Sequence, residues 1–123
     1  HIVEAMEEYF EENGYIRIQT PTIAKMGAEG GAELFPVIYY GDEAFLSQSP
    51  QLYKQMLMAA GFDKVYETGK AFRAEEFATS RHVSETSMFD VELSFIEDQH
   101  DVMDVLENSL RHVLNELQGR ARE

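Results

Sequence analysis

Two β-prone segments, Val65 to Glu75 and Thr86 to Ile96, are joined by a short and mostly polar stretch. Strand-like segments of that length with a polar connection predict a long β-hairpin. In the second segment apolar and polar side chains alternate, with Phe89, Val91, Leu93 and Phe95 on one face and Asp90, Glu92 and Ser94 on the other. The apolar face of this hairpin therefore has to be covered by other elements, whereas the acidic face is predicted to meet solvent or a ligand.

Helical patterns at the two ends of the chain can provide that cover. Apolar residues recur at helical spacing from Ile2 to Phe10, and Asn13-Gly14 ends the run. From Gln99 onward a longer amphipathic helix is predicted, whose apolar stripe comprises Val102, Met103, Val105, Leu106, Leu110, Val113, Leu114 and Leu117. Together with the hairpin, these helices predict an α+β fold in which an antiparallel β-sheet is flanked by helices.

A third helix is predicted between Ser49 and Gly61. Ser49 suits the N-cap, Pro50 suits the first helical position, and Gly61 suits the position after the helix end. The stripe that this helix is expected to bury comprises Leu52, Tyr53, Met56, Leu57 and Ala60.

Shorter elements are predicted between the first and the third helix. Tyr15 to Thr20 alternates like a strand and stops at the proline that follows. Lys25 to Glu33 is rich in glycine, which predicts a loop of the kind that often covers a ligand. Phe35 to Tyr40 and Ala44 to Leu46 then predict two short strands joined by a tight turn at Gly41-Asp42.

The composition restricts what the chain can bind. Its 123 residues, a length that fits one domain, carry a formal net charge of −13, which opposes contact with nucleic acid except at a local basic site. Dense carboxylates also fit adaptation to high salt. The absence of cysteine excludes disulfides and thiolate chemistry, and the histidines lack metal-ligand spacing. No apolar run approaches the roughly 20 residues of a membrane span, so we expect a cytoplasmic protein without a membrane partner.

Charged residues gather at the open end of the predicted hairpin. Arg73 and Glu75 share one face at the end of its first segment, and Arg81 and His82 follow in the connection. Across the hairpin, that face is expected to look along the acidic row of the second segment. An arginine surrounded by carboxylates suits a polyanion together with a cation, whereas a solvated surface ion pair is the simpler interpretation of an isolated Arg-x-Glu.

One segment of the chain resembles motif 2 of the class II aminoacyl-tRNA synthetases: Phe72-Arg73-Ala74-Glu75-Glu76 followed by Thr79-Ser80-Arg81-His82. The similarity is close for the aspartyl and asparaginyl branch of that family. Motif 1 of the family resembles the segment Gly14 to Pro21. The substrate loop of the aspartyl enzymes resembles Glu29-Gly30-Gly31, and their amino-acid pocket resembles Gln48 to Gln55. The resemblance implies that residues 1–123 form one catalytic-core segment, with motif 1 at about 9–21, the pocket segment at 28–55 and motif 2 at about 65–95.

The resemblance further implies activation of aspartate with ATP and, in the full-length enzyme, transfer of aspartate to tRNA. It places Arg73 at the α-phosphate of ATP, Glu75 near the adenine or the tRNA end, and Arg81 with His82 near the outer phosphates. Among these residues Arg73 would act in catalysis, because its charge would stabilise the phosphate as pyrophosphate leaves.

The resemblance also assigns the amino-acid side of the site. Glu29 and Gln48 would hold the substrate ammonium group, and Gln51 belongs to the same segment. Lys54 would bind the side-chain carboxylate, which favours aspartate over asparagine because an ammonium group attracts a carboxylate more strongly than an amide.

Other features of the family have no counterpart in these residues. Motif 3, with its second ATP-binding arginine, is not found up to Glu123. Use of ATP implies Mg²⁺, but its ligands are not identifiable in the sequence, since Asp90 and Glu92 suit a solvated strand face as well as contact with magnesium or ribose. Motif 1 implies a homodimer.

Three alternatives remain open at the level of the sequence. The first is an asparaginyl-tRNA synthetase or an asparagine-synthesising paralogue. The second is a binding or dimerisation module without catalysis. The third is an engineered minimal core.

Overall fold

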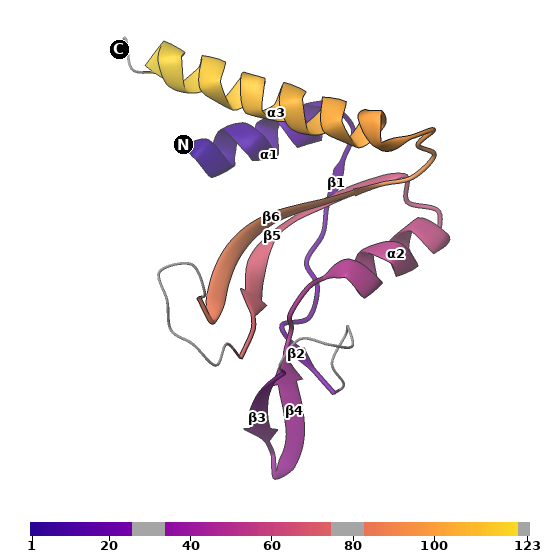
Figure 1. Ribbon diagram of the computed structural model, residues 1–123, viewed down its shortest axis with the longest axis vertical. Helices are drawn as coiled ribbons and strands as arrows, with labels where there is room; N and C mark the ends of the chain where they lie inside the picture. Colours follow the sequence, from indigo (N-terminus) through magenta and orange to yellow (C-terminus); the bar gives the residue numbers. More distant parts are fainter. Residues whose placement is uncertain (26–33, 75–82, 121–123) are drawn as a thin grey trace.

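The computed structural model in Figure 1 describes residues 1–25, 34–74 and 83–120, with only the backbone described at residue 120. The elements along the chain are α1 (Ile2–Glu12), β1 (Ile16–Arg17), β2 (Ile23–Ala24), β3 (Phe35–Tyr39), β4 (Asp42–Leu46), α2 (Gln51–Ala59), β5 (Lys64–Phe72), β6 (Glu85–Leu93) and α3 (Gln99–Arg120). They form two three-stranded sheets, ordered β1-β5-β6 and β2-β4-β3. On the larger sheet, α1 and α3 lie side by side on one face and α2 lies on the other (Figure 1). The predicted α+β class is therefore confirmed.

The long hairpin predicted from the sequence is the pair β5 and β6. Its antiparallel register runs from Lys64 opposite Leu93 to Phe72 opposite Glu85. Both strands end earlier than predicted, and Phe95 leaves the alternation because its backbone has a positive φ of 58°. The sheet is not purely antiparallel, since β1 pairs in parallel with the start of β5.

The core lies between α1, α3 and the apolar face of the hairpin. Phe10, Tyr15 and Tyr66 are buried at its centre, and the rings of Tyr66 and Phe89 stack with centroids 5.4 Å apart. The Tyr66 hydroxyl donates a hydrogen bond of 2.8 Å to Oε1 of Glu11 on α1. Burial, together with this hydrogen bond, raises the pKa of Tyr66 to about 12.

The smaller sheet is built around the β3–β4 hairpin, which extends away from the core (Figure 1). Tyr39 is paired with Asp42, so the turn falls on Tyr40 and Gly41 and the predicted turn at Gly41-Asp42 is off by one residue. Tyr40 and Gly41 have φ values of 52° and 90°. A two-residue hairpin turn of type I′ has positive φ at both central residues, and glycine supplies the second here at no steric cost.

The helix α2 does not bury the predicted stripe. Leu52, Met56 and Ala60 are exposed, and the buried side chain of this helix is Lys54. The helix also begins one residue later than predicted: Pro50 is the N-cap residue, and the Ser49 hydroxyl instead accepts a hydrogen bond of 3.1 Å from the backbone N–H of Gln51. Apolar spacing located the helix but not the face that packs, because that face is turned toward charged residues of β6.

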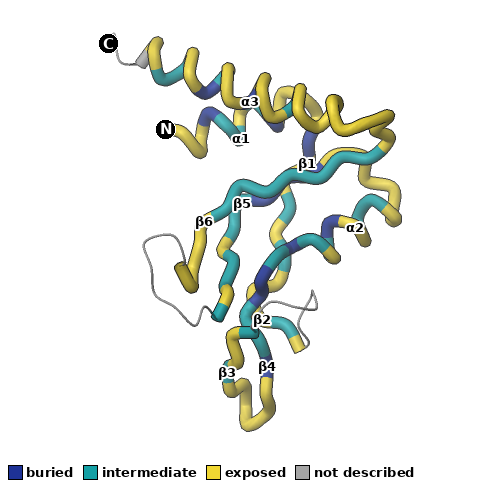
Figure 2. The backbone as a smooth tube through the Cα atoms, viewed as in Figure 1, coloured by how far each residue is buried: buried dark blue, intermediate teal, exposed yellow. Residues whose placement is uncertain are grey.

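The helix α3 packs with only part of its apolar stripe. Val105, Ser109 and Val113 face the core side, whereas the predicted core residues Val102, Met103, Leu106, Leu110 and Leu114 are exposed. Figure 2 shows this division, with the buried positions of α3 on the side toward α1 and exposed positions along its outer side. No helix within the described ranges is both long and apolar enough to span a membrane.

Candidate active site

Lys54 lies at the centre of a charged cluster between α2 and β6. Its side chain is 2% exposed, and its ammonium group forms ion pairs with Asp90 and, at 3.3 Å, with Oε2 of Glu92. The same ammonium group donates to the carbonyl oxygen of Val91, and Nε2 of Gln51 donates to Oε2 of Glu92 at 3.2 Å. One cation therefore meets two carboxylates, which leaves a formal charge of −1 in the cluster. Balance by opposite charge is what allows a lysine to be buried.

The alternation of β6 explains how the two carboxylates reach Lys54. The core residues Phe89, Val91 and Leu93 point toward α1 and α3, so Asp90 and Glu92 point to the opposite face, on the side of α2. The solvated strand face considered from the sequence does not describe these two residues, because both are partly buried and paired with Lys54.

Arg73 does not meet the acidic row, and the predicted arginine surrounded by carboxylates is wrong for the described residues. The register places Asp90 opposite Glu67 and Glu92 opposite Val65. Arg73 lies six residues beyond Glu67, which corresponds to about 20 Å along a strand. Its backbone N–H donates 3.0 Å to the carbonyl oxygen of Ser84, and its side chain is exposed.

The remaining predicted site residues divide into two groups. Gln48 and Gln51 flank the start of α2, where Gln48 is buried and Gln51 is part of the Lys54 cluster. The other predicted residues, Glu29, Glu75, Arg81 and His82, lie outside the described residues.

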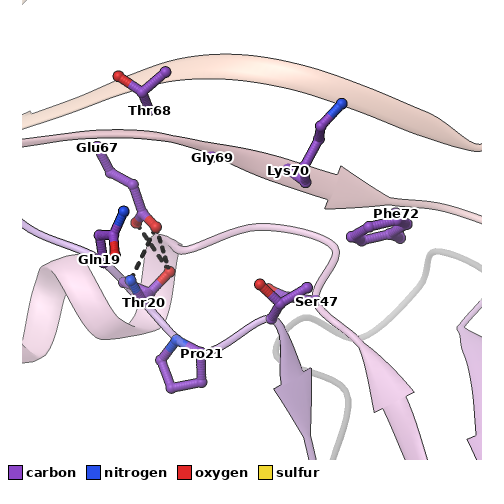
Figure 3. Close-up of a pocket in the computed structure, with 10 residues that line it drawn as sticks. Gln19, Thr20, Pro21, Ser47, Glu67, Thr68, Gly69, Lys70 and Phe72 are labelled. Carbon is purple, nitrogen blue, oxygen red and sulfur yellow. Dashed lines mark hydrogen bonds between the residues drawn. The ribbon is translucent and has the colours of Figure 1, made fainter.

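A second polar site, not predicted from the sequence, surrounds a cavity of about 260 Å³ beside β5. Glu67 is 5% exposed and points from β5 toward Thr20 (Figure 3). Its Oε1 accepts a hydrogen bond of 2.9 Å from the Thr20 backbone N–H, and its Oε2 accepts one of 2.9 Å from the Thr20 hydroxyl. The sequence did contain a sign of this site. Glu67 falls on the same face of the predicted strand as Arg73, within a segment that is otherwise suited to burial.

A magnesium ion would need a particular set of side chains. Mg²⁺ prefers oxygen ligands in octahedral geometry. Within residues 1–25, 34–74 and 83–120 no group of three or more histidine, aspartate or glutamate side chains could hold a metal ion. Asp90 and Glu92 are both directed at Lys54.

Comparison with known proteins defines the class to which this fold and site belong. The family described as tRNA synthetases class II (D, K and N) matches residues 1–123. The chain therefore belongs to the class II aminoacyl-tRNA synthetases of this group.

Individual curated relatives of this chain are named aspartate–tRNA ligases. The chain is 54% identical to the aspartate–tRNA(Asp/Asn) ligase of Methanopyrus kandleri over 94% of its own length and 27% of the relative. It is 50% identical to the aspartate–tRNA(Asp) ligase of Pyrococcus furiosus, covering 94% of this chain and 26% of that one. The chain thus spans about a quarter of the length of these curated relatives.

Solved structures agree on the fold. Asparaginyl-tRNA synthetase from Pyrococcus horikoshii, complexed with asparaginyl-adenylate, superposes with a TM-score of 0.82 at 32% identity, over 93% of this chain and 26% of that chain. The asparaginyl-tRNA synthetase of Entamoeba histolytica superposes with a TM-score of 0.85 at 30% identity, over 99% of this chain and 27% of that chain. The asparaginyl alternative is not favoured, because curated relatives at 50% to 54% identity over most of this chain are named aspartate–tRNA ligases.

Proposed function

We propose that this chain forms part of an aspartate-activating site that uses ATP and that, in the full-length enzyme, serves the transfer of aspartate to tRNA. The observation that carries the proposal is the 50–54% identity, over most of the chain, to proteins named aspartate–tRNA ligases. In the reaction the α-carboxylate of aspartate attacks the α-phosphorus of ATP. The bond from that phosphorus to the bridging oxygen breaks, and pyrophosphate leaves with the electron pair.

The charges of the Lys54 cluster support aspartate as the amino acid. Aspartate offers an ammonium group and a side-chain carboxylate, and the cluster offers the opposite charges in Asp90 and Lys54. Because Lys54 is already paired, we infer that the substrate carboxylate takes the place of a protein carboxylate on Lys54. Gln48 and Glu29 would complete the ammonium side, and Gln51 would keep Glu92 in place.

The ATP side of the proposed site rests on Arg73. Its side chain is exposed and can therefore contact a nucleotide. A guanidinium group can donate two parallel hydrogen bonds to the oxygens of one phosphate. Glu75, Arg81 and His82 would assist at the adenine and the outer phosphates. The catalytic effect would come from positioning and charge stabilisation, and no described residue is assigned as a general base.

We further propose a cytoplasmic, homodimeric protein whose residues 1–123 are one catalytic-core segment, with dimer contacts through the motif 1 region at about 9–21. ATP would be used together with Mg²⁺.

The test is aspartate-dependent ATP–pyrophosphate exchange on the purified full-length enzyme that contains this chain, with asparagine and lysine as competing amino acids. We expect exchange with aspartate and little inhibition by either competitor. Exchange that depends on asparagine would contradict the amino-acid assignment. A folded protein that is silent with both would contradict catalysis by this chain and favour the binding-module alternative.

A further inference from the structure

The carboxylate of Glu67 is buried without a cation among the described residues that contact it. Its partners are the backbone N–H and the hydroxyl of Thr20, with bonds of 2.9 to 3.1 Å. A buried carboxylate is costly unless its hydrogen bonds are made, so this contact holds the chain after β1 firmly against β5. Neither residue takes part in the reaction described above.

The Thr20 contact is one step in a closed circuit that is made of hydrogen bonds and of the short chain segments between them. Beyond Thr20 the chain reaches Thr22, whose carbonyl oxygen accepts a 2.8 Å hydrogen bond from the N–H of Ser47. The carbonyl oxygen of Ser47 in turn accepts a 2.9 Å hydrogen bond from the N–H of Phe72, which is on β5 like Glu67. We call this circuit, formed by Glu67, Thr20, Thr22, Ser47 and Phe72, the clamp ring. Its members all line the cavity shown in Figure 3.

Two members of the clamp ring are directly followed in the sequence by residues of the proposed site, one on each side of that site. Ser47 immediately precedes Gln48, on the amino-acid side, and Phe72 immediately precedes Arg73, on the ATP side. The hydrogen bond between Ser47 and Phe72 is therefore the point where the two halves are joined through the backbone. The Thr20–Glu67 contact closes the circuit and limits how far this junction can shift.

We propose that Glu67 is a positioning residue for adenylate formation, which acts through Thr20 to fix the spacing between the segment of Gln48 and that of Arg73. This inference rests on the proposed function. A misplacement of about 1 Å between reacting groups can lower a rate roughly 100-fold. Loss of the clamp should therefore lower kcat more than it raises KM for aspartate or ATP.

The chain offers a matched control for this test. The hydroxyl of Thr68 also donates to a glutamate, with a bond of 3.1 Å to Oε1 of Glu7. Thr68 is next to Glu67 on β5 but points away from Thr20 (Figure 3). Thr20→Val and Thr68→Val thus each remove one hydroxyl bonded to a glutamate, and only the first weakens the clamp ring, in which the backbone N–H of position 20 still donates to Glu67.

The experiment measures pyrophosphate exchange and amide hydrogen exchange on the same variants. For Thr20→Val we expect kcat per folded molecule to fall roughly 10- to 100-fold, with KM values changed less than about threefold. The conservative Thr20→Ser should restore kcat, and Thr68→Val should match the wild type. In the Glu67→Ala background Thr20→Val should have little further effect, because residues of one network are not additive.

The amide readout separates this inference from the proposed function. In Thr20→Val we expect faster exchange at the Ser47 and Phe72 amides, but not in Thr68→Val. Absence of exchange activity in the wild type would contradict the proposed function, and the amide result would still decide whether Thr20 restrains the junction. If the wild type is active, an unchanged kcat in Thr20→Val, or equal losses in both valine variants, would overturn the positioning role alone.

Discussion

The ammonium nitrogen of Lys54 lies 3.3 Å from Oε2 of Glu92, and the same glutamate oxygen accepts a hydrogen bond from Gln51. Asp90 contacts the lysine from the same strand. Two carboxylates of β6 thus depend on one buried charge from α2. Whatever Lys54 does for a substrate, it also neutralises part of the acidic face of β6.

Replacement of Lys54 by methionine is expected to destabilise the fold as well as the site. Met keeps most of the side-chain volume, but Asp90 and Glu92 would be left without their cation. Breaking a buried pair in this way typically costs about 3 to 5 kcal/mol. Urea unfolding monitored by circular dichroism measures the loss.

Two further variants control for the Lys54 result. Lys70→Met removes a lysine whose ion pair with Glu85 is half exposed, and it should cost less than about 1 kcal/mol. Addition of Asp90→Asn to Lys54→Met should recover part of the lost stability, since one uncompensated charge disappears. Equal unfolding midpoints for the Lys54 and Lys70 variants would show that the cluster contributes nothing special.

Gly69→Ala is expected to destabilise the hairpin, although alanine usually suits a strand better than glycine by about 0.5 to 1 kcal/mol. A methyl carbon on Gly69 would lie 3.2 Å from Oε1 of Glu67. Thr20 restrains that carboxylate, so it cannot move aside freely, and overpacking of this kind costs about 1 to 3 kcal/mol. The unfolding free energy of the variant checks this.

A second glycine-to-alanine change serves as a control for whether Gly69→Ala stabilises or destabilises the protein. Among the described residues, and apart from its chain neighbours and the nearby backbone of α3, no heavy atom lies within 4 Å of a methyl carbon added at Gly119, and Gly119→Ala should stabilise by up to about 1 kcal/mol. In a Glu67→Ala background Gly69→Ala should become neutral or favourable. Stabilisation by Gly69→Ala in the wild-type background would contradict the restraint of Glu67.

Tyr66 should make the stability of the protein depend on pH in the alkaline range. Burial and the bond to Glu11 raise the pKa of Tyr66 to about 12, whereas an unfolded tyrosine has a pKa of about 10. Below about pH 10 the phenol is protonated in both states, so its contribution to stability is fully present. Between about pH 10 and 12 only the unfolded state ionises, and stability falls by up to about 1.4 kcal/mol per pH unit.

Tyr66→Phe isolates that contribution, because phenylalanine has no proton to lose. The difference in unfolding free energy between the wild type and this variant should be constant up to about pH 10 and should then move in favour of the variant. A difference that stays constant up to about pH 12 would mean that the Tyr66 phenol ionises equally in the folded and unfolded states.

Arg73→Ala should abolish ATP–pyrophosphate exchange while leaving the unfolding free energy within about 0.5 kcal/mol of the wild type. The reason is that the Arg73 side chain is exposed and has no ion pair among the described residues. Arg111→Ala, which removes an exposed arginine paired with Glu107 on α3, should keep full activity. Exchange that survives in Arg73→Ala would remove this residue from the proposed ATP site.

The sequence predicted the elements of this fold better than the contacts between them. The hairpin of β5 and β6 was recognisable because its alternation has a period that only a strand produces. The C-terminal ends of α1 and α2 followed from the glycines that come after them. The buried face of α2 was missed because apolar spacing carries no information about a lysine whose partners, Asp90 and Glu92, lie on a distant strand.

The expected contacts between site residues depended on strand register, which the sequence does not give. Arg73 and Asp90 share a strand face, but only the observed register shows that they are far apart along the hairpin. The Thr20–Glu67 contact could not be predicted at all, since it depends on the parallel pairing of β1 with β5. Sequence patterns show which face of a strand a residue occupies, whereas the distance between two residues on that face depends on how the strands pair.

The parallel pairing of β1 with β5 also has a consequence for how the protein reaches its native state. Thr20 and Glu67 are 47 positions apart in the chain, so their contact closes a long loop, and the entropy of that closure must be spent before the hydrogen bonds form. The β5–β6 hairpin joins neighbouring segments and can form without it. We therefore expect hairpin amides to gain protection first during refolding, and the junction between the two halves of the site to be among the last regions to order.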